Sequence, residues 1–207
     1  MNILHVSCSP RGRSSESLRL SREIIGRLLE VDPAATLIHR VVGDGTIPPI
    51  DEAYAASQQS SVDLSTTGSA ARSDELIQEL ENSDVVVIAT PMHNFSAPAA
   101  LKLWIDHVVR VRRTFDVTSA GKVGLLRDRP VLVAVSSGGR FSGDGVRQPD
   151  FLTTYLKTIL GMVGLHDLAF FAVQGTAFGP DAVAEARAKS RQALQDHFSS
   201  ARWRAWR

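Results

Sequence analysis

The stretch NILHVSCSPRGRSSES, residues 2–17, contains the signals of a strand, a loop and the start of a helix. Residues 2–7 form a nearly continuous apolar run, which is typical of a parallel strand covered on both faces. A hydroxyl-rich segment over residues 7–17 follows, and then Leu18, Ile25 and Leu28 recur on one face of a helix. The stretch therefore predicts a strand whose carboxyl end leads through a polar loop into an amphipathic helix.

The same succession of a short apolar run and a helical pattern continues along the chain. Strands are predicted near residues 2–7, 36–42, 84–90, 130–136 and 168–174, and helices over 15–31, 72–82, 97–109, 150–163 and 180–198. Five strands alternating with five helices predict an α/β fold with a doubly wound parallel sheet.

Two segments stand outside this alternation. Residues 43–70 have weak periodicity and are interpreted as a long surface excursion, either a lid, a partner contact or an insertion without a role. Residues 110–129 are interpreted as a small hairpin beside the sheet. The basic, aromatic tail over 200–207 is too short to anchor the chain to a membrane, so we expect it to fray or to contact a partner subunit.

Length and composition narrow the class of protein. A chain of 207 residues predicts one domain, and its formal net charge of +1 gives no electrostatic reason to bind nucleic acid. The single cysteine, Cys8, cannot form an internal disulfide, and no apolar run approaches the ~20 residues of a membrane span. A cytoplasmic protein with small-molecule partners is expected.

The first loop, residues 7–17, has the composition of a phosphate site. A helix N-terminus offers unpaired N–H groups, and serine hydroxyls add donors with little bulk. Neither the P-loop pattern nor Gly-x-Gly-x-x-Gly is present, so a phosphomonoester is favoured over a triphosphate or a dinucleotide. The alternative is simple capping of the helix by Ser14 or Ser15. Cys8 is interpreted as a small buried hydrophobe rather than a nucleophile.

The second loop, residues 90–98, follows the very apolar third strand. Met92, His93, Asn94 and Phe95 combine a thioether, an imidazole, an amide and an aromatic ring, which suits a flat heteroaromatic ligand with polar edges. His93 as a solvated polar residue and Asn94 as a cap of the following turn are the alternatives.

The third loop, residues 136–145, follows the fourth strand. Its Ser136, Ser137, Gly138 and Gly139 allow the backbone to approach a ligand and to direct N–H groups at it, although a flexible turn would use the same glycines. In open α/β sheets ligands bind at the carboxyl ends of the strands. The three loops are therefore expected to meet around one ligand.

In this order and at these positions, the loops resemble those of the flavodoxin-like NADH:quinone oxidoreductase and azoreductase family over most of the chain. The matching runs are Ser9 with Ser15–Ser17, residues 91–95, 136–139, 73–77, Tyr155-Leu156, 160–164 and 177–180. The resemblance implies a flavodoxin-like sheet of order 2-1-3-4-5 with helices on both faces. It also implies tightly bound FMN, NADH or NADPH as electron donor, and a homodimer with a flavin site at each end of the interface.

The resemblance also assigns roles to residues. Ser9, Ser15, Glu16 and Ser17 would surround the FMN phosphate, with Glu16 contributing its backbone. Met92, His93, Asn94 and Phe95 would line the isoalloxazine, and Ser136, Ser137, Gly138 and Gly139 its pyrimidine edge.

Three further residues are substrate candidates. This sequence departs from the family at His93, where the family often has tyrosine. It also departs at Ile159 and Met162, where the family can have aromatic residues near the neighbouring subunit's flavin. These departures leave the substrate preference open. Phe115 either closes over the acceptor or packs within its hairpin.

The expected activity is two-electron transfer from NAD(P)H to quinones and azo compounds by a ping-pong mechanism, with His93 as a candidate proton donor. The main alternative is a flavodoxin-type electron carrier, which the net charge of +1 disfavours. A Rossmann dehydrogenase would use an acidic residue after the second strand, but Asp44 lies well beyond the usual offset of ~20 residues from the first loop. Hydrolysis by a Ser-His-Asp triad is disfavoured because the sequence has no Gly-x-Ser-x-Gly elbow.

Overall fold

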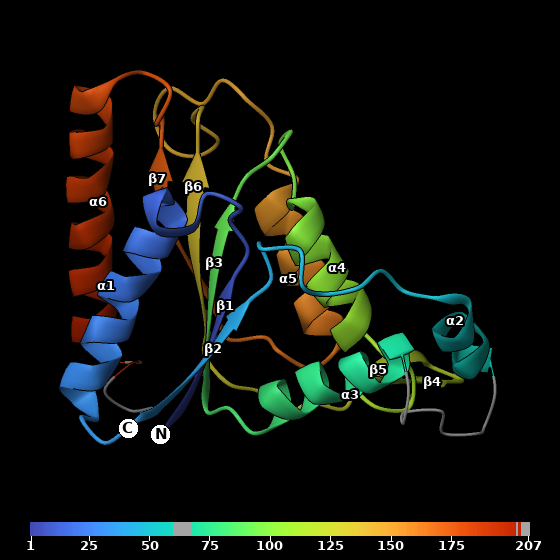
Figure 1. Ribbon diagram of the computed structural model, residues 1–207. Helices are drawn as coiled ribbons and strands as arrows, with labels where there is room; N and C mark the ends of the chain where they lie inside the picture. The colour runs from blue at the N-terminus through green and yellow to red at the C-terminus, as the bar shows by residue number, and fades with distance from the viewer. Residues whose placement is uncertain (60–67, 202, 204–207) are drawn as a thin grey trace.

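A computed structural model of the chain describes residues 1–59, 68–201 and 203, and its centre is a parallel sheet (Figure 1). The sheet has the order β2-β1-β3-β6-β7, in which every neighbouring pair is parallel. Its strands are β1 (Asn2–Ser7), β2 (Thr36–Val41), β3 (Val85–Pro91), β6 (Val131–Ser137) and β7 (Leu168–Gln174). The expected order 2-1-3-4-5 is confirmed, since β6 and β7 are the fourth and fifth strands of this sheet.

Helices cover both faces of the sheet. The helices are α1 (Glu16–Val31), α2 (Glu52–Gln59), α3 (Gly68–Glu81), α4 (Ala99–Val108), α5 (Leu152–Met162) and α6 (Pro180–Ser199), and a single 3-10 turn, η1 (Gly12–Ser14), precedes α1. Figure 1 shows α1 and α6 on one face and α3, α4 and α5 on the other. Among the described residues, no helix is both long and apolar enough to cross a membrane.

The apolar runs are continuous because each strand contributes to two cores. In β1, Leu4 and Val6 belong to the core under α3, α4 and α5, whereas Ile3 belongs to the core under α1 and α6. Val85 and Val87 of β3 join the second core and are fully buried. Burial of both faces stabilises the sheet by about 25 cal/mol for each Å² of apolar surface removed from water.

The segment over residues 43–70 contains more structure than its weak periodicity predicts. It includes α2 and the start of α3, and Ile47 and Tyr54 are buried. Buried His107 of α4 contacts this segment, with 2.8 Å between its Nε2 and the carbonyl oxygen of Pro48. Residues 60–67 of the expected excursion lie outside the described residues. The part that is described packs against the body of the molecule.

The expected hairpin in 110–129 is present as β4 (Phe115–Thr118) paired antiparallel with β5 (Gly121–Gly124). In the C-terminal tail, Trp203 packs on its own chain. Trp203 is 3% exposed and packs edge-to-face on Phe198, with 4.7 Å between ring centroids. An amphipathic aromatic residue after the last helix finds apolar surface on its own chain. The remainder of the tail, residues 202 and 204–207, lies outside the described residues.

A buried histidine connects β1 to α1 and has no local signal in the sequence. His5 Nε2 lies 2.9 Å from Ser21 Oγ, and Ser21 Oγ donates to the Leu18 carbonyl. The Ser21 oxygen therefore accepts from His5 Nε2–H, which leaves His5 Nδ1 to accept from His39 Nδ1–H at 3.1 Å. Burial, followed by the charge on His39, lowers the pKa of His5 to about 3, so its imidazole is neutral at pH 7.

Candidate functional site

The three loops meet at the carboxyl edge of the sheet (Figure 1). Cys8 N–H donates to the Ala89 carbonyl at 2.8 Å, which joins the first loop to β3. Met92 N–H donates to the Ser136 carbonyl at 2.8 Å, which joins the second loop to β6. The predicted convergence of residues 7–17, 90–98 and 136–145 at one edge is confirmed. Cys8 is fully buried, and burial raises the pKa of its thiol, so it is the small hydrophobe that was expected.

The first loop brings its buried hydroxyls to the N-terminus of α1. Ser9, Ser15 and Ser17 are all at most 5% exposed. Ser15 is the N-cap: its Oγ accepts from Leu18 N–H at 3.4 Å and lies 2.9 Å from Ser17 Oγ. The capping alternative is therefore correct for Ser15, while Ser14 is exposed. A cap and an anion site are compatible, because the remaining N–H groups of the first turn lack intrahelical acceptors.

The carboxylate of Glu16 is paired with two arginines beside the loop. Arg187 on α6 forms a two-armed ion pair with it, and Arg19 Nε contacts it at 3.0 Å. The hydrogen bond from Arg187 contributes most to lowering the pKa of Glu16. Glu16 is therefore ionised near pH 7, and its charge is balanced by these two arginines.

An open cavity of about 550 Å³ lies beside this loop. Its lining includes Ser14, Ser15 and four arginines, namely Arg13, Arg19, Arg22 and Arg187. Glu16 and Glu23 are the two carboxylates in the same lining. The excess of guanidinium groups makes the entrance to the first loop favourable for an anion.

Gly43 closes the first loop from the side of β2. A Cβ atom at this position would lie 2.5 Å from the Ser9 carbonyl oxygen and 2.8 Å from the Cys8 carbonyl carbon. Gly43 N–H also donates to the Ser7 carbonyl at 3.1 Å. The backbone of residues 7–9 thus rests on a glycine that comes after the second strand. Sequence reasoning treated Gly43 only as the start of an excursion.

The second loop makes a tight turn that presents its side chains outward. His93 N–H donates to the Ser96 carbonyl at 3.0 Å and Ser96 N–H donates back to the His93 carbonyl at 2.9 Å. Between them Asn94 and Phe95 have φ of 49° and 68°, the left-handed region that costs a residue such as Phe about 1 kcal/mol or more. Asn94 thus lies inside the turn itself, and the N-cap of the following helix α4 is Pro98.

Phe95 and Met92 lie differently in this loop. Phe95 is 45% exposed, whereas Met92 is buried below the turn. The Phe95 carbonyl accepts from Phe151 N–H at 3.0 Å, which fastens the turn to the start of α5. A strained turn held at both ends and carrying an exposed ring is suited to contacting a ligand face.

The third loop is fastened to the segment after β7. The Gly139 carbonyl accepts from Gly175 N–H at 3.1 Å, and the Gly138 carbonyl accepts from Ala177 N–H at 3.2 Å. Ser137 is buried, and Gly138 is exposed at the edge of the sheet. With both carbonyls directed into the protein, the peptide planes leave backbone N–H groups of this loop available on the outer side.

Gln148 is a residue of this site that sequence reasoning missed. Its Nε2 lies 3.0 Å from Ser137 Oγ and 3.1 Å from Met92 Sδ, so one amide joins the second and third loops. Its Oε1 would lie 2.1 Å from a Cβ on Gly139. The amide therefore covers the glycine that the ligand is expected to approach. No spacing or motif in the sequence points to it, because it lies in an irregular loop before α5.

The three substrate candidates lie away from the loops of their own chain. Phe115 is half-buried on the hairpin, with Lys122 Nζ 5.4 Å from its ring, and Ile159 and Met162 are half-buried on α5. All three pack against the same core. The hairpin follows α4, which runs back from the carboxyl edge, so Figure 1 places it at the amino edge. Within one chain the hairpin therefore lies at the opposite edge of the sheet from the three loops, and Ile159 and Met162 lie in the last turns of α5, toward that same edge.

Comparison with known proteins gives a match along almost the whole chain. Residues 1–198 match the model of a family described as having a flavodoxin-like fold. An FMN-dependent NADH:quinone oxidoreductase of Pseudomonas fluorescens is 47% identical over 195 residues, which cover 93% of each chain. A second FMN-dependent NADH:quinone oxidoreductase, from Burkholderia lata, is also 47% identical, over 85% of this chain and 86% of that protein.

Solved structures show the same architecture. An FMN-dependent NADH-azoreductase of Bacillus anthracis, crystallised in complex with FMN, superposes with a TM-score of 0.77 at 25% identity, covering 94% of this chain and 98% of that one. The azoreductase AzrA superposes with a TM-score of 0.81 at 20% identity, covering 94% of this chain and 97% of that one. At that identity the second match supports the fold alone.

Proposed function

Because this chain belongs to the flavodoxin-like family of FMN-dependent NADH:quinone oxidoreductases, we propose that it binds FMN at the three loops and uses NADH to reduce quinones and azo compounds. The observation that carries the proposal is the meeting of three chemically different loops at one edge of the sheet. One loop is rich in buried hydroxyls, one presents an exposed ring from a strained turn, and one has paired glycines.

The first loop fits a phosphomonoester dianion. Ser9, Ser15 and Ser17 offer buried hydroxyls, and the N-terminus of α1 offers N–H groups together with the positive end of the helix dipole. The Glu16 carboxylate, which would repel the phosphate, is neutralised by Arg187 and Arg19. These residues would hold the phosphate of FMN.

The second and third loops fit a flat ring with a polar edge. Met92 and Phe95 would provide apolar contacts, and Asn94 would provide an amide near the ring. Gly138 and Gly139 would direct backbone N–H groups at the pyrimidine edge, where a fixed donor can contribute up to ~3 kcal/mol to stabilising developing negative charge. Ser136 and Ser137 would flank that edge, with Gln148 fixing the position of Ser137 Oγ.

When bound, FMN supplies the two-electron chemistry, accepting a hydride equivalent from the nicotinamide and passing the electrons to the acceptor. The protein's part is to orient the donor and the acceptor in turn on one open face, which is a ping-pong sequence. His93 is exposed at the mouth of the second loop, and a ring nitrogen of its imidazole is the group we propose to give a proton to the reduced acceptor. If His93→Gln retains full turnover and the same pH profile, that role of His93 is refuted.

An anaerobic titration of the purified protein tests the activity. The protein should be yellow, should be bleached by one equivalent of NADH for each flavin, and should recover its colour when menadione is added. Parallel double-reciprocal lines would support the ping-pong order, and a parallel titration with NADPH would measure donor preference. Negligible NADH oxidation with menadione, despite bound flavin, would instead support the electron-carrier alternative.

We propose further that two copies of the chain associate. Three large apolar side chains support this: Phe95, Val146 and Phe151 are 45–60% exposed, and Phe151 N–H donates to the Phe95 carbonyl, so two of them are neighbours. Association would also allow Phe115, Ile159 and Met162 of one copy to approach the loops of the other, where they would influence the choice of acceptor. Light scattering after gel filtration should give twice the chain mass, 22.4 kDa per copy, and a monomer at micromolar concentration would refute this arrangement.

A further inference from the structure

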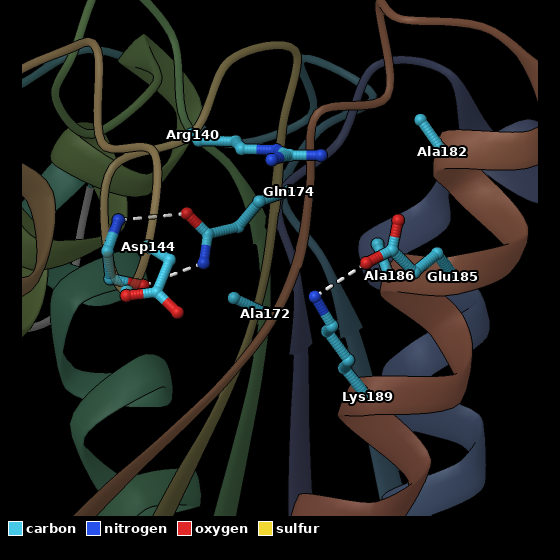
Figure 2. A pocket seen from close by; sticks show the side chains of 10 residues that line it. Arg140, Asp144, Ala172, Gln174, Ala182, Glu185, Ala186 and Lys189 are labelled. Atoms are coloured by element: carbon cyan, nitrogen blue, oxygen red, sulfur yellow. Dashed lines mark hydrogen bonds and ion pairs between the residues drawn. The ribbon is translucent and has the colours of Figure 1, made fainter.

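A separate cavity of about 280 Å³ lies at the opposite border of the sheet from β2, between the third loop and α6 (Figure 2). Ala172 and Gln174 of the edge strand β7 form its floor. Ala182 and Ala186, one turn apart on α6, form one wall. Space is present because these alanine side chains do not fill the angle between the edge strand and the helix. The proposed FMN residues are not among its lining residues.

Two opposite charges line this cavity without pairing with each other. Arg140 and Asp144 both come from the third loop, and neither forms an ion pair within the described part of the chain. Figure 2 shows the Arg140 side chain reaching across the top of the cavity toward α6 and the Asp144 carboxylate lying lower, on the loop side. The cavity thus presents one unpaired cation and one unpaired anion at different places on its border.

The α6 wall also carries two charged side chains, and these form an ion pair with each other. Lys189 Nζ lies 2.6 Å from Glu185 Oε1 in an ion pair one helical turn long, and Figure 2 shows this pair facing the cavity. This pair is neutral in sum, and the charge of Arg140 also contributes to lowering the pKa of Glu185. Among the described residues that line the cavity, Arg140 and Asp144 are the charged side chains without an ion pair of their own. An anion alone would leave Asp144 unpaired, and a cation alone would leave Arg140 unpaired.

The loop that carries these charges is held in place by β7. Gln174 Oε1 accepts from Phe141 N–H at 2.7 Å and from Ser142 N–H at 3.0 Å, while its Nε2 donates to Ser142 Oγ at 2.7 Å. The Arg140 side chain passes close to two glycines: its Nη1 would lie 3.4 Å from a Cβ placed on Gly145, and its Nε would lie 3.6 Å from a Cβ placed on Gly175. The backbone that carries Arg140 is therefore held in place before any ligand arrives, which reduces the entropy lost on binding.

We propose that this cavity is a binding site for a small zwitterionic amino carboxylate. The carboxylate would pair with Arg140, whose planar guanidinium suits two parallel hydrogen bonds, and the ammonium would pair with Asp144. The carbon chain between the two charged groups would lie against Ala172, Ala182 and Ala186. The site differs from the FMN site in its lining and in its ligand chemistry, so it does not depend on the proposed activity.

Calorimetric titration of the purified, flavin-loaded protein with a flexible zwitterion, aminohexanoate with a terminal amine, tests the proposal. Hexanoate and hexylamine are the matched probes that carry one charge each. We expect the zwitterion to bind at least about tenfold more tightly than either probe. Arg140→Met and Asp144→Asn should each abolish that difference. Arg147→Met, two residues after that loop and outside the lining, should leave it unchanged.

Ala186→Leu provides a second variant in case a loop substitution disturbs folding. Leucine is a good helix former, changes no charge, and would fill the cavity from α6, so binding of all three probes should be lost. Equal affinity for the three probes, absence of heat with the zwitterion, or full binding by Ala186→Leu would each overturn the proposal.

Discussion

Replacing Gly43, which is not itself a proposed FMN contact, by alanine should weaken FMN binding through the backbone of Ser9. The new Cβ would lie 2.5 Å from the Ser9 carbonyl oxygen, 2.6 Å from the Ser9 carbonyl carbon and 2.8 Å from the Cys8 carbonyl carbon. An ordinary contact begins at 3.4 Å, so the backbone of the first loop must move by 3.4 − 2.5 = 0.9 Å. All three neighbours are main-chain atoms, and no side chain can rotate to relieve the contact.

The displacement affects stability and ligand affinity by different amounts. Overpacking of this kind typically costs 1–3 kcal/mol in the free energy of unfolding. A shift of nearly one ångström at Ser9 would also lose one or two hydrogen bonds to the phosphate, each worth about 1.5 kcal/mol or more to a charged group. The Kd for FMN should therefore rise by about tenfold to a hundredfold.

Quenching of flavin fluorescence by the apoprotein measures the Kd, and urea unfolding measures stability. Gly26→Ala is the matched control, because Gly26 lies in α1 and a Cβ there meets nothing within 4 Å. That substitution should stabilise the protein by about 0.5–1 kcal/mol and leave the Kd for FMN unchanged. An unchanged Kd in Gly43→Ala would refute the inference that this glycine supports a phosphate loop.

Gln148→Leu removes the amide that joins the second and third loops and leaves buried Ser137 Oγ without this partner. FMN should therefore bind about tenfold more weakly, as measured by fluorescence titration. Gln148→Glu is the isosteric comparison. The free energy of unfolding should fall as the pH is lowered from about 6.5 toward 3, because His5 takes up a proton in the unfolded state but stays neutral where it is buried in the folded state. The slope of this free energy is up to ~1.4 kcal/mol per pH unit. His5→Phe should reduce the difference in stability that urea unfolding measures between pH 7 and pH 5. Arg187→Met leaves Glu16 less fully neutralised beside the first loop, which should raise the Kd for FMN about fivefold at low salt. Recovery in the double variant with Glu16→Gln would identify charge repulsion as the cause, and no recovery would contradict it.

The amino-acid sequence was sufficient to predict the elements and the edge of the sheet that carries the site. Apolar runs such as residues 2–7 and 85–89 indicate strands buried on both faces, and the alternation of strands with helices indicates a parallel sheet. The loops over 7–17, 90–98 and 136–145 follow directly, because the carboxyl ends of parallel strands lie at one edge. These features are local, and each is encoded by a few neighbouring residues.

The tertiary structure alone decided how distant parts of the chain complete the site. Gly43 supports Ser9 from the turn after β2, Gln148 connects Met92 to Ser137, and Arg187 neutralises Glu16 from the last helix. Such contacts join residues far apart in sequence, and their partners are chosen by packing, for which no spacing or composition gives a signal.

The same reason applies to the substrate candidates and to the second cavity. Phe115, Ile159 and Met162 lie far from the loops of their own chain because α4 and α5 run back to the amino edge of the sheet. The cavity between the third loop and α6 exists because Ala172 on the edge strand and Ala182 and Ala186 on α6 have side chains too small to fill the space between strand and helix. Periodicity places an alanine on a helix face, but only the packing of that helix against the sheet determines whether it leaves a space.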